Sequence, residues 1–243
     1  MLSCKPPMNS DAGNETLVMT ATFNADATPY LVVRDECERI RQYICALLSW
    51  AGPTRVRRIV FGENSNTAFD FTPIIRHLQA AGKEVEVIVF AGNHDVPRLG
   101  KGYGEGRILE YLCSHSRLLR AAPSFYKVTG RLFVSNFDQV SAATTSRDAF
   151  RRKRWKDPAR TPKVITRFFK CSHELFERRL LDAYEEADDT KGVHIEHIYF
   201  NRLSDLDVPD FGVKPVLVGQ QASTGEIYGA YDEEIVRTAR SLI

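Results

Sequence analysis

The first 120 residues alternate between short apolar runs and amphipathic segments, and this alternation constrains the fold more than any other feature. Strand-like runs lie at 16–24, 58–62 and 85–90, and each is followed by a segment with helical spacing of its apolar residues. A β-α-β-α-β-α order predicts a parallel sheet with helices on its faces and right-handed crossovers. The run at 16–24 carries no charge, which is typical of a strand buried on both faces.

Capping residues and helix breakers predict where the helices begin and end. Asp35 and Glu38 resemble a capping box, and Gly52-Pro53 ends the helix that follows. Thr72-Pro73 predicts the start of the next helix. In the later half we expect a hairpin or bent strand pair over 124–136 and helices at 173–187, 193–203 and 231–242.

The composition is that of an ordinary globular protein, with 43% hydrophobic and 26% charged residues among 243. A net charge of +2 does not steer the chain toward nucleic acid or membrane. No apolar run approaches the ~20 residues that cross a bilayer. We expect a disordered leader over 1–15, which has no signal-peptide core, and a single domain over 16–243. Five cysteines without a C-x-x-C pair predict reduced thiols and a cytoplasmic protein.

Polar residues follow all three early strands. Ligands of open α/β sheets bind outside the carboxyl ends of the strands, so this pattern favours a nucleotide or sugar site. The alternative is that Asn and Asp simply favour loops. The polar residues in question are Thr22 and Asn24, then Glu63 and Asn64, then Asn93, His94 and Asp95.

Two further motifs are candidates for binding phosphate. GKGYGEG at 100–106 has glycines that admit a ligand close to the backbone, and Lys101 adds a charge; the alternative is a structural turn. Its place in the chain and its spacing fit neither a dinucleotide fingerprint nor a P-loop. In KVTGR, Lys127 and Arg131 are suited to clamp a diphosphate, or they are the solvent-facing charges of a hairpin.

The later half adds a basic segment and a carboxylate–histidine cluster. Residues 147–170 are rich in Lys and Arg. Such a composition is typical of a solvated loop, or it indicates a surface that binds an anionic acceptor at a membrane. With Trp155 as the one aromatic residue within the dense cluster 151–156, we expect no nucleic-acid partner. Glu196, on a helix with His194 and His197, is a candidate general base.

The ordered motifs resemble the GT-A type nucleotide-diphospho-sugar glycosyltransferases, in particular bacterial families of lipopolysaccharide or capsule assembly. The likeness extends over about 16–228. The motifs that carry it are TATFN, R-x-x-Q-Y (39–43), GENSN, GKGYGEG, FYKVTGRLFVSNF, F-K-C-S-H-x-x-F and HIEHIYFNRL.

The resemblance implies a Rossmann-like GT-A fold, α/β with a mostly parallel central sheet flanked by helices. It implies a nucleotide-binding half over 16–122 and an acceptor and catalytic half over 123–243. It also implies a nucleotide-sugar donor and a glycan or glycolipid acceptor, at the inner face of the membrane if the contact through 147–170 is made. The implied donor-binding residues are Thr20, Thr22, Asn24, Glu63, Asn64, Lys101, Gly102, Gly104, Lys127 and Arg131. The implied catalytic residues are Glu196, as the base, and Asp189.

The departure from the family pattern concerns the metal. Such enzymes often carry D-x-D after the fourth strand, where this chain reads KVTGR. Three options stay open: Lys127 and Arg131 replace Mg²⁺ or Mn²⁺, Asn93, His94 and Asp95 bind the metal, or activity is lost.

Two other functions compete with the transferase. GNHD at 92–95 resembles one motif of metal-dependent phosphoesterases, although the other ligand motifs of a two-metal centre are missing. A non-catalytic sugar-nucleotide-binding module is the third hypothesis.

Overall fold

A computed structural model describes residues 14–25, 28–157 and 159–243 of the chain. The expected leader falls on residues 1–13, which lie outside this part, and on Asn14 and Glu15. The first strand begins at Glu15 and is buried from Thr16 to Ala21, as the uncharged run predicted.

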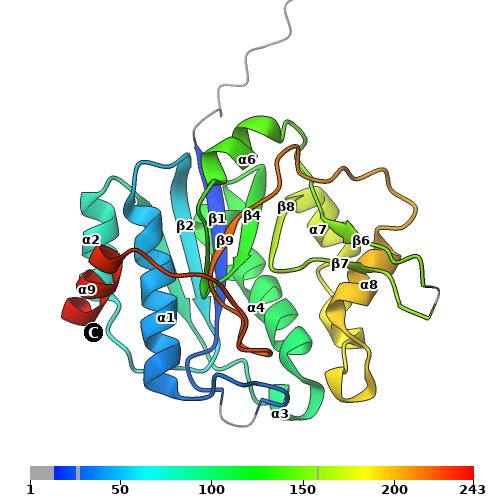
Figure 1. Cartoon of the computed structure of the whole chain (residues 1–243), viewed down its shortest axis with the longest axis horizontal. Helices are drawn as coiled ribbons and strands as arrows, with labels where there is room; N and C mark the ends of the chain where they lie inside the picture. Colours follow the sequence, from blue (N-terminus) through cyan, green and yellow to red (C-terminus); the bar gives the residue numbers. More distant parts are fainter. Residues whose placement is uncertain (1–13, 26–27, 158) are drawn as a thin grey trace, which may run out of the picture.

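The central sheet is mostly parallel, and the predicted α/β class is confirmed. Its order is β3-β2-β1-β4-β8; only the pair β4 and β8 is antiparallel. The order therefore reverses between β1 and β4, where the chain moves to the other side of the first strand (Figure 1). The strands are β1 (Glu15–Ala21), β2 (Val56–Glu63), β3 (Glu84–Val89), β4 (Ser124–Thr129) and β8 (Phe168–Ser172).

Helices cover both faces of this sheet because alternate strand residues point to opposite sides. Leu17 and Met19 pack into a core with α1 and α2, while Val18 packs into a second core with α4, α5 and α8. In Figure 1, α1, α2 and α9 group at one side of the sheet and α7 and α8 at the other. The helices are α1 (Glu36–Leu48), α2 (Thr72–Ala80), α3 (Val96–Leu99), α4 (Lys101–His115), α5 (Arg117–Arg120), α6 (Phe137–Ala143), α7 (His173–Arg179), α8 (Ile195–Arg202) and α9 (Glu233–Leu242).

The capping signals near the amino end have the predicted effect. The Asp35 side chain accepts a hydrogen bond from the Glu38 amide at 2.7 Å, so it caps α1. A short 3₁₀ turn (Ser49–Ala51) follows before Gly52 ends the segment. Pro73 lies in the first turn of α2, where its missing N–H costs nothing.

Of the two alternatives predicted for 124–136, the hairpin is wrong and the bent strand pair is confirmed. β4 joins the central sheet, whereas β5 (Leu132–Val134) pairs with β9 (Leu217–Gln220) in a second sheet that β10 (Ile227–Gly229) completes. The bend at Gly130 and Arg131 therefore carries the chain from one sheet to another. Its tightness has a local cause: a Cβ on Gly130 would lie 2.5 Å from the Thr20 carbonyl oxygen.

The predicted helix over 173–187 begins where expected but is too long, since α7 ends at Arg179 and a separate 3₁₀ turn follows at Ala183–Glu186. A second 3₁₀ turn, Asp189–Lys191, precedes α8. Within the basic segment, β6 (Arg152–Lys153) and β7 (Lys163–Val164) pair as a small antiparallel hairpin. Lys153, Arg160 and Lys163 each lie over the Trp155 ring, within 6.0 Å of its centroid.

The glycines of GKGYGEG lie in a helix rather than in a turn, because α4 begins at Lys101. They allow close packing: a Cβ on Gly106 would lie 2.2 Å from Tyr184 Cβ, and one on Gly104 would lie 2.7 Å from a Val96 methyl. Gly100, with φ +98°, precedes the helix in a conformation that L residues rarely adopt.

We expect Gly106→Ala to destabilise the protein by about 2 kcal/mol, although alanine is the better helix former. The cause is the clash of the new methyl group with the side chain of Tyr184. Urea unfolding followed by circular dichroism measures the change. Gly52→Ala is the matched control, because a Cβ there meets no atom within 4 Å, and it should change stability by less than about 0.5 kcal/mol. Equal stability of the two variants would contradict this account of the motif.

Candidate active site

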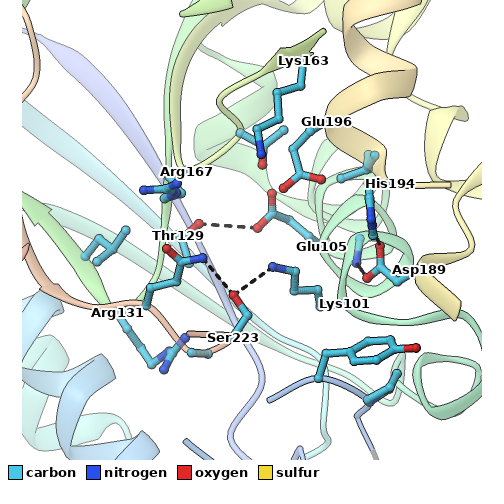
Figure 2. Close-up of a pocket in the computed structure, with 18 of the residues that line it drawn as sticks. Lys101, Glu105, Thr129, Arg131, Lys163, Arg167, Asp189, His194, Glu196 and Ser223 are labelled. Atoms are coloured by element: carbon cyan, nitrogen blue, oxygen red, sulfur yellow. Dashed lines mark hydrogen bonds and ion pairs between the residues drawn. The ribbon is translucent and has the colours of Figure 1, made fainter. Parts of the chain in front are cut away.

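A cavity of about 320 Å³ opens beyond the carboxyl end of β4, at the reversal of the strand order. Ligands of open α/β sheets bind at such a reversal. The cavity is closed by α4, the start of α8, the hairpin of β6 and β7, and the segment after β9 (Figure 2). Its lining residues are Pro29, Tyr30, Lys101, Gly102, Glu105, Thr129, Arg131, Leu132, Lys163, Thr166, Arg167, Asp189, His194–His197 and Gln220–Ser223.

Cations in this lining lack anionic partners. Lys101, Lys163, Arg131 and Arg167 form no ion pair with any described residue. Lys101 Nζ donates to Ser223 Oγ at 3.2 Å, and Arg167 donates to the Tyr228 hydroxyl. The cavity is thus suited to bind an anion, whose negative charge would pair with these cations.

Arg131 is the most constrained of these cations. The residue is 3% exposed, and its guanidinium lies over the Tyr43 ring and donates to Gln42 Oε1 at 3.2 Å. Its Nε is buried and has no hydrogen-bond partner among the described residues. Burial lowers the pKa of Arg131. A buried cation without a carboxylate partner is costly in the free protein.

Lys127 lies directly beneath the cavity. Its side chain is 0% exposed, and its Nζ lies 2.6 Å from Glu105 Oε1 and donates to the Thr166 carbonyl at 2.8 Å. Burial lowers the pKa of Lys127, and the Glu105 carboxylate opposes that shift. Lys127 therefore serves to hold Glu105, whose other oxygen accepts from Thr129 Oγ1 at 3.5 Å.

Carboxylates and histidines occupy the other wall. Glu196 is half-buried and makes no hydrogen bond or ion pair with the described residues, and Figure 2 shows it and Glu105 pointing toward one another. Asp189 is buried and forms a hydrogen bond with His194. His197 donates from Nδ1 to the Pro162 carbonyl at 2.8 Å.

Glu63, an implied donor-binding residue, does not line the cavity. It is fully buried, and its carboxylate accepts from the amides of Phe23 at 2.9 Å, Ser65 at 2.9 Å and Thr67 at 3.2 Å. The Ser65 hydroxyl donates to the same carboxylate. Glu63 therefore ties together the loops that follow β1 and β2.

The other polar residues at the ends of β1 and β2 also bond to one another. Thr22 Oγ1 donates to Asn64 Oδ1 at 2.6 Å, and the Asn24 amide donates to Ser65 Oγ at 3.0 Å. The Thr20 carbonyl accepts from the Gly130 amide at 3.0 Å. None of these residues lines the cavity, and neither does Gly104, which packs against Val96.

The GNHD segment lies apart from the cavity as well. Asn93 donates to the Asn24 carbonyl at 3.2 Å, and Asp95 pairs with Arg98 at 3.3 Å. Over 14–25, 28–157 and 159–243, no group of three His, Cys, Asp or Glu side chains is placed to hold a metal ion. The Asn93, His94 and Asp95 set thus gains no further ligand there.

The fold brings together five of the residues predicted from the sequence, and they line one cavity: Lys101, Gly102, Arg131, Asp189 and Glu196. Several other lining residues were not predicted from the sequence. Glu105 lies within the glycine motif, and Lys163 and Arg167 lie within the basic segment. Their place in these motifs could have indicated that they belong to the site. Gln220 is the last residue of β9, and Gln221 and Ser223 follow it; the sequence carried no signal for these three polar residues.

The fold is similar to that of solved glycosyltransferases. The apo form of GlyE from Streptococcus pneumoniae TIGR4 matches with a TM-score of 0.50 and 12% identity, over 81% of this chain and 44% of GlyE. WbbM, a bifunctional glycosyltransferase, matches with a TM-score of 0.48 and 8% identity, over 99% of this chain and 45% of WbbM.

A further match has a different activity. The 4-diphosphocytidyl-2C-methyl-D-erythritol synthase of Anaerococcus prevotii DSM 20548 has a TM-score of 0.45 and 12% identity, over 97% of this chain and 99% of its own. This chain spans less than half the length of GlyE and WbbM, so the likeness to them concerns the fold of one part. Neither a protein-family model nor a curated protein matches the sequence. Among the described residues, no helix is both long and apolar enough to cross a membrane.

Proposed function

We propose that the chain transfers a sugar from a nucleotide-sugar donor to a hydroxyl of a glycan or glycolipid. The observation that carries the proposal is the group of unpaired cations Lys101, Lys163, Arg131 and Arg167 around one cavity at the strand-order reversal. A nucleoside diphosphate gains negative charge as the glycosidic bond breaks. Fixed cations that meet this charge stabilise the transition state more than the ground state.

The cavity cations act at different points of the diphosphate in this proposal. Arg131 offers a planar, two-pronged donor from a fixed position beside Tyr43, which suits a phosphate oxygen pair. Lys101, at the first turn of α4, adds a point charge beside the positive end of the helix dipole. Arg167 and Lys163 come from the basic segment and close the cavity from the opposite side.

The family resemblance implies a divalent metal, but the described residues form no three-ligand site for one. Glu105 is paired with Lys127 and Asp189 with His194, so Glu196 alone remains without a partner among the described residues. No described group of three ligands is placed for a metal ion. We therefore attribute charge neutralisation to the cations and derive no step through a metal.

The acceptor and its setting extend the proposal. The likeness to lipopolysaccharide and capsule enzymes supports hexosyl transfer to a cell-surface glycan at the cytoplasmic face of the membrane. The same segment that provides Lys163 and Arg167 carries other exposed cations around Trp155, which suits an anionic lipid-linked acceptor. Vesicle co-sedimentation with and without anionic lipid measures that contact.

Thermal shift with UDP-, GDP-, CMP- and dTDP-sugars, each with and without Mn²⁺, tests the function. A donor at 100 times its Kd stabilises by about 2.7 kcal/mol, which is about 5–10 °C for a protein of this size. We expect one donor class to raise the melting temperature without Mn²⁺. The matching nucleoside, which lacks the diphosphate, should give no shift.

Other outcomes separate the rival functions. A shift with Mn²⁺ alone and with no nucleotide would overturn the transferase in favour of the GNHD phosphoesterase. A donor that binds, with no nucleoside diphosphate released over hours, would instead identify a sugar-nucleotide-binding module.

A further inference from the structure

A carboxylate–imidazole pair opens onto the cavity. His194 Nδ1 lies 2.8 Å from Asp189 Oδ1, and the Asp189 side chain is 5% exposed against 43% for His194. Because an ionised carboxylate only accepts hydrogen bonds, the contact places the imidazole proton on Nδ1. The other ring nitrogen, Nε2, then carries the lone pair and is free to accept a proton.

The first residues of α4 hold Asp189 in place. Asp189 Oδ2 accepts a hydrogen bond from the Gly102 backbone amide at 3.1 Å. A Cβ on Gly100 would lie 2.4 Å from Asp189 Cβ, and one on Gly102 would lie 3.3 Å from Oδ1. The two glycines thus make room for the carboxylate at the amino end of α4. The GKG part of the motif fixes the orientation of the imidazole through this carboxylate.

We propose that His194 is the general base of the transfer and that Asp189 positions it; this rests on the proposed function. The acceptor O–H gives its proton to His194 Nε2 as the oxygen forms a bond to the anomeric carbon. The bond between that carbon and the diphosphate oxygen breaks, and its electron pair leaves with the nucleoside diphosphate. Asp189 stabilises the imidazolium that forms.

The other candidate bases lack this support. Glu196 has no hydrogen bond or ion pair with the described residues that would fix its orientation. His197 has the same Nδ1 arrangement as His194, but its partner is the neutral carbonyl of Pro162, which stabilises an imidazolium less. The charged and titratable groups that share the cavity with His194 are Tyr30, Lys101, Glu105, Arg131, Lys163, Arg167, Asp189, Glu196 and His197.

The release of nucleoside diphosphate from the nucleotide sugar that binds, with water as the acceptor, tests the base over pH 4–9. We expect His194→Gln to lower the rate about 100-fold with an unchanged thermal shift for the donor. In the wild type, the pH–rate profile should have an acidic limb, because a protonated imidazole cannot act as the base, and Glu196→Gln should leave that limb in place. Asp189→Asn should lower the rate about tenfold and move the limb to lower pH, which a purely structural role would not do.

The control is His115→Gln, because His115 likewise uses Nδ1 in a hydrogen bond, to the Tyr111 carbonyl, but lies outside the cavity. It should keep the rate and the pH profile. A full rate in His194→Gln, or an acidic limb that Glu196→Gln abolishes, would overturn the assignment. A wild type that binds the donor and releases no nucleoside diphosphate would overturn it too, whereas failure of every donor to bind would overturn the proposed function itself.

Nitrogen-15 NMR of histidine-labelled protein gives a readout that needs no turnover. The His194 signals, identified by their loss in His194→Gln, should show a proton on Nδ1 in the neutral form of the ring. A proton on Nε2 instead would contradict the proposal, since that nitrogen could not then act as the base.

Discussion

Replacement of Arg131 by methionine is expected to raise the Kd for the nucleotide-sugar donor about 100-fold without loss of thermal stability. Methionine keeps an unbranched apolar side chain at this position and removes a buried cation that no described carboxylate neutralises. A charged hydrogen bond to a phosphate is worth about 1.5–3 kcal/mol, which corresponds to about 10–100-fold in Kd. Titration calorimetry with the donor and a melting curve of the free protein measure the two effects.

Arg39→Met is the informative comparison, because Arg39 lies over the same Tyr43 ring and is equally buried. Its guanidinium, however, donates to the carbonyls of Thr22, Phe23 and Val33. Its removal should destabilise the protein by about 2 kcal/mol, since these acceptors lose their donors. If Arg131→Met instead melts several degrees lower and binds the donor with unchanged Kd, Arg131 is a structural residue and the diphosphate site lies elsewhere.

Part of the fold could be predicted from the sequence, and part of it could not. The alternation of strands and helices up to residue 120 is encoded locally, so β1, β2, β3 and their helices followed from periodicity and capping. The split between β4 and β5 did not, because β5 pairs with a strand about 80 residues later. Local patterns show that a segment is extended but not which sheet it joins.

The candidate site shows the same division. Lys101, Asp189 and Glu196 were singled out because each stands in a compact motif of charged or glycine residues, and all three line the cavity. Polar residues at the ends of β1 and β2 looked equally suited to a ligand. In the fold they satisfy one another, as the 2.6 Å bond between Thr22 and Asn64 illustrates. Residue type indicates that a side chain needs a partner, and only the packing decides whether that partner is a ligand or a neighbouring loop.

Glu63→Ala is expected to destabilise the protein by about 4 kcal/mol, the largest stability effect that we predict for one substitution. The fully buried carboxylate is the acceptor for the backbone amides of Phe23, Ser65 and Thr67. Alanine leaves these amides without that acceptor, at a cost of about 1–3 kcal/mol for each that water cannot reach. Equilibrium unfolding in urea, with the midpoint and slope compared with wild type, measures the loss.

Glu84→Ala is the control, since Glu84 lies on the neighbouring strand with a 59% exposed side chain and a 4.0 Å ion pair to Arg58. It should change stability by less than about 0.5 kcal/mol. Glu63→Gln separates the structural role from the implied donor-binding role, because the amide oxygen still accepts hydrogen bonds but the charge is gone. We expect it to lose stability and to bind the donor as wild type does. A variant with full stability and a raised donor Kd would show instead that Glu63 contacts the nucleotide and that the donor extends along the strand ends beyond the cavity.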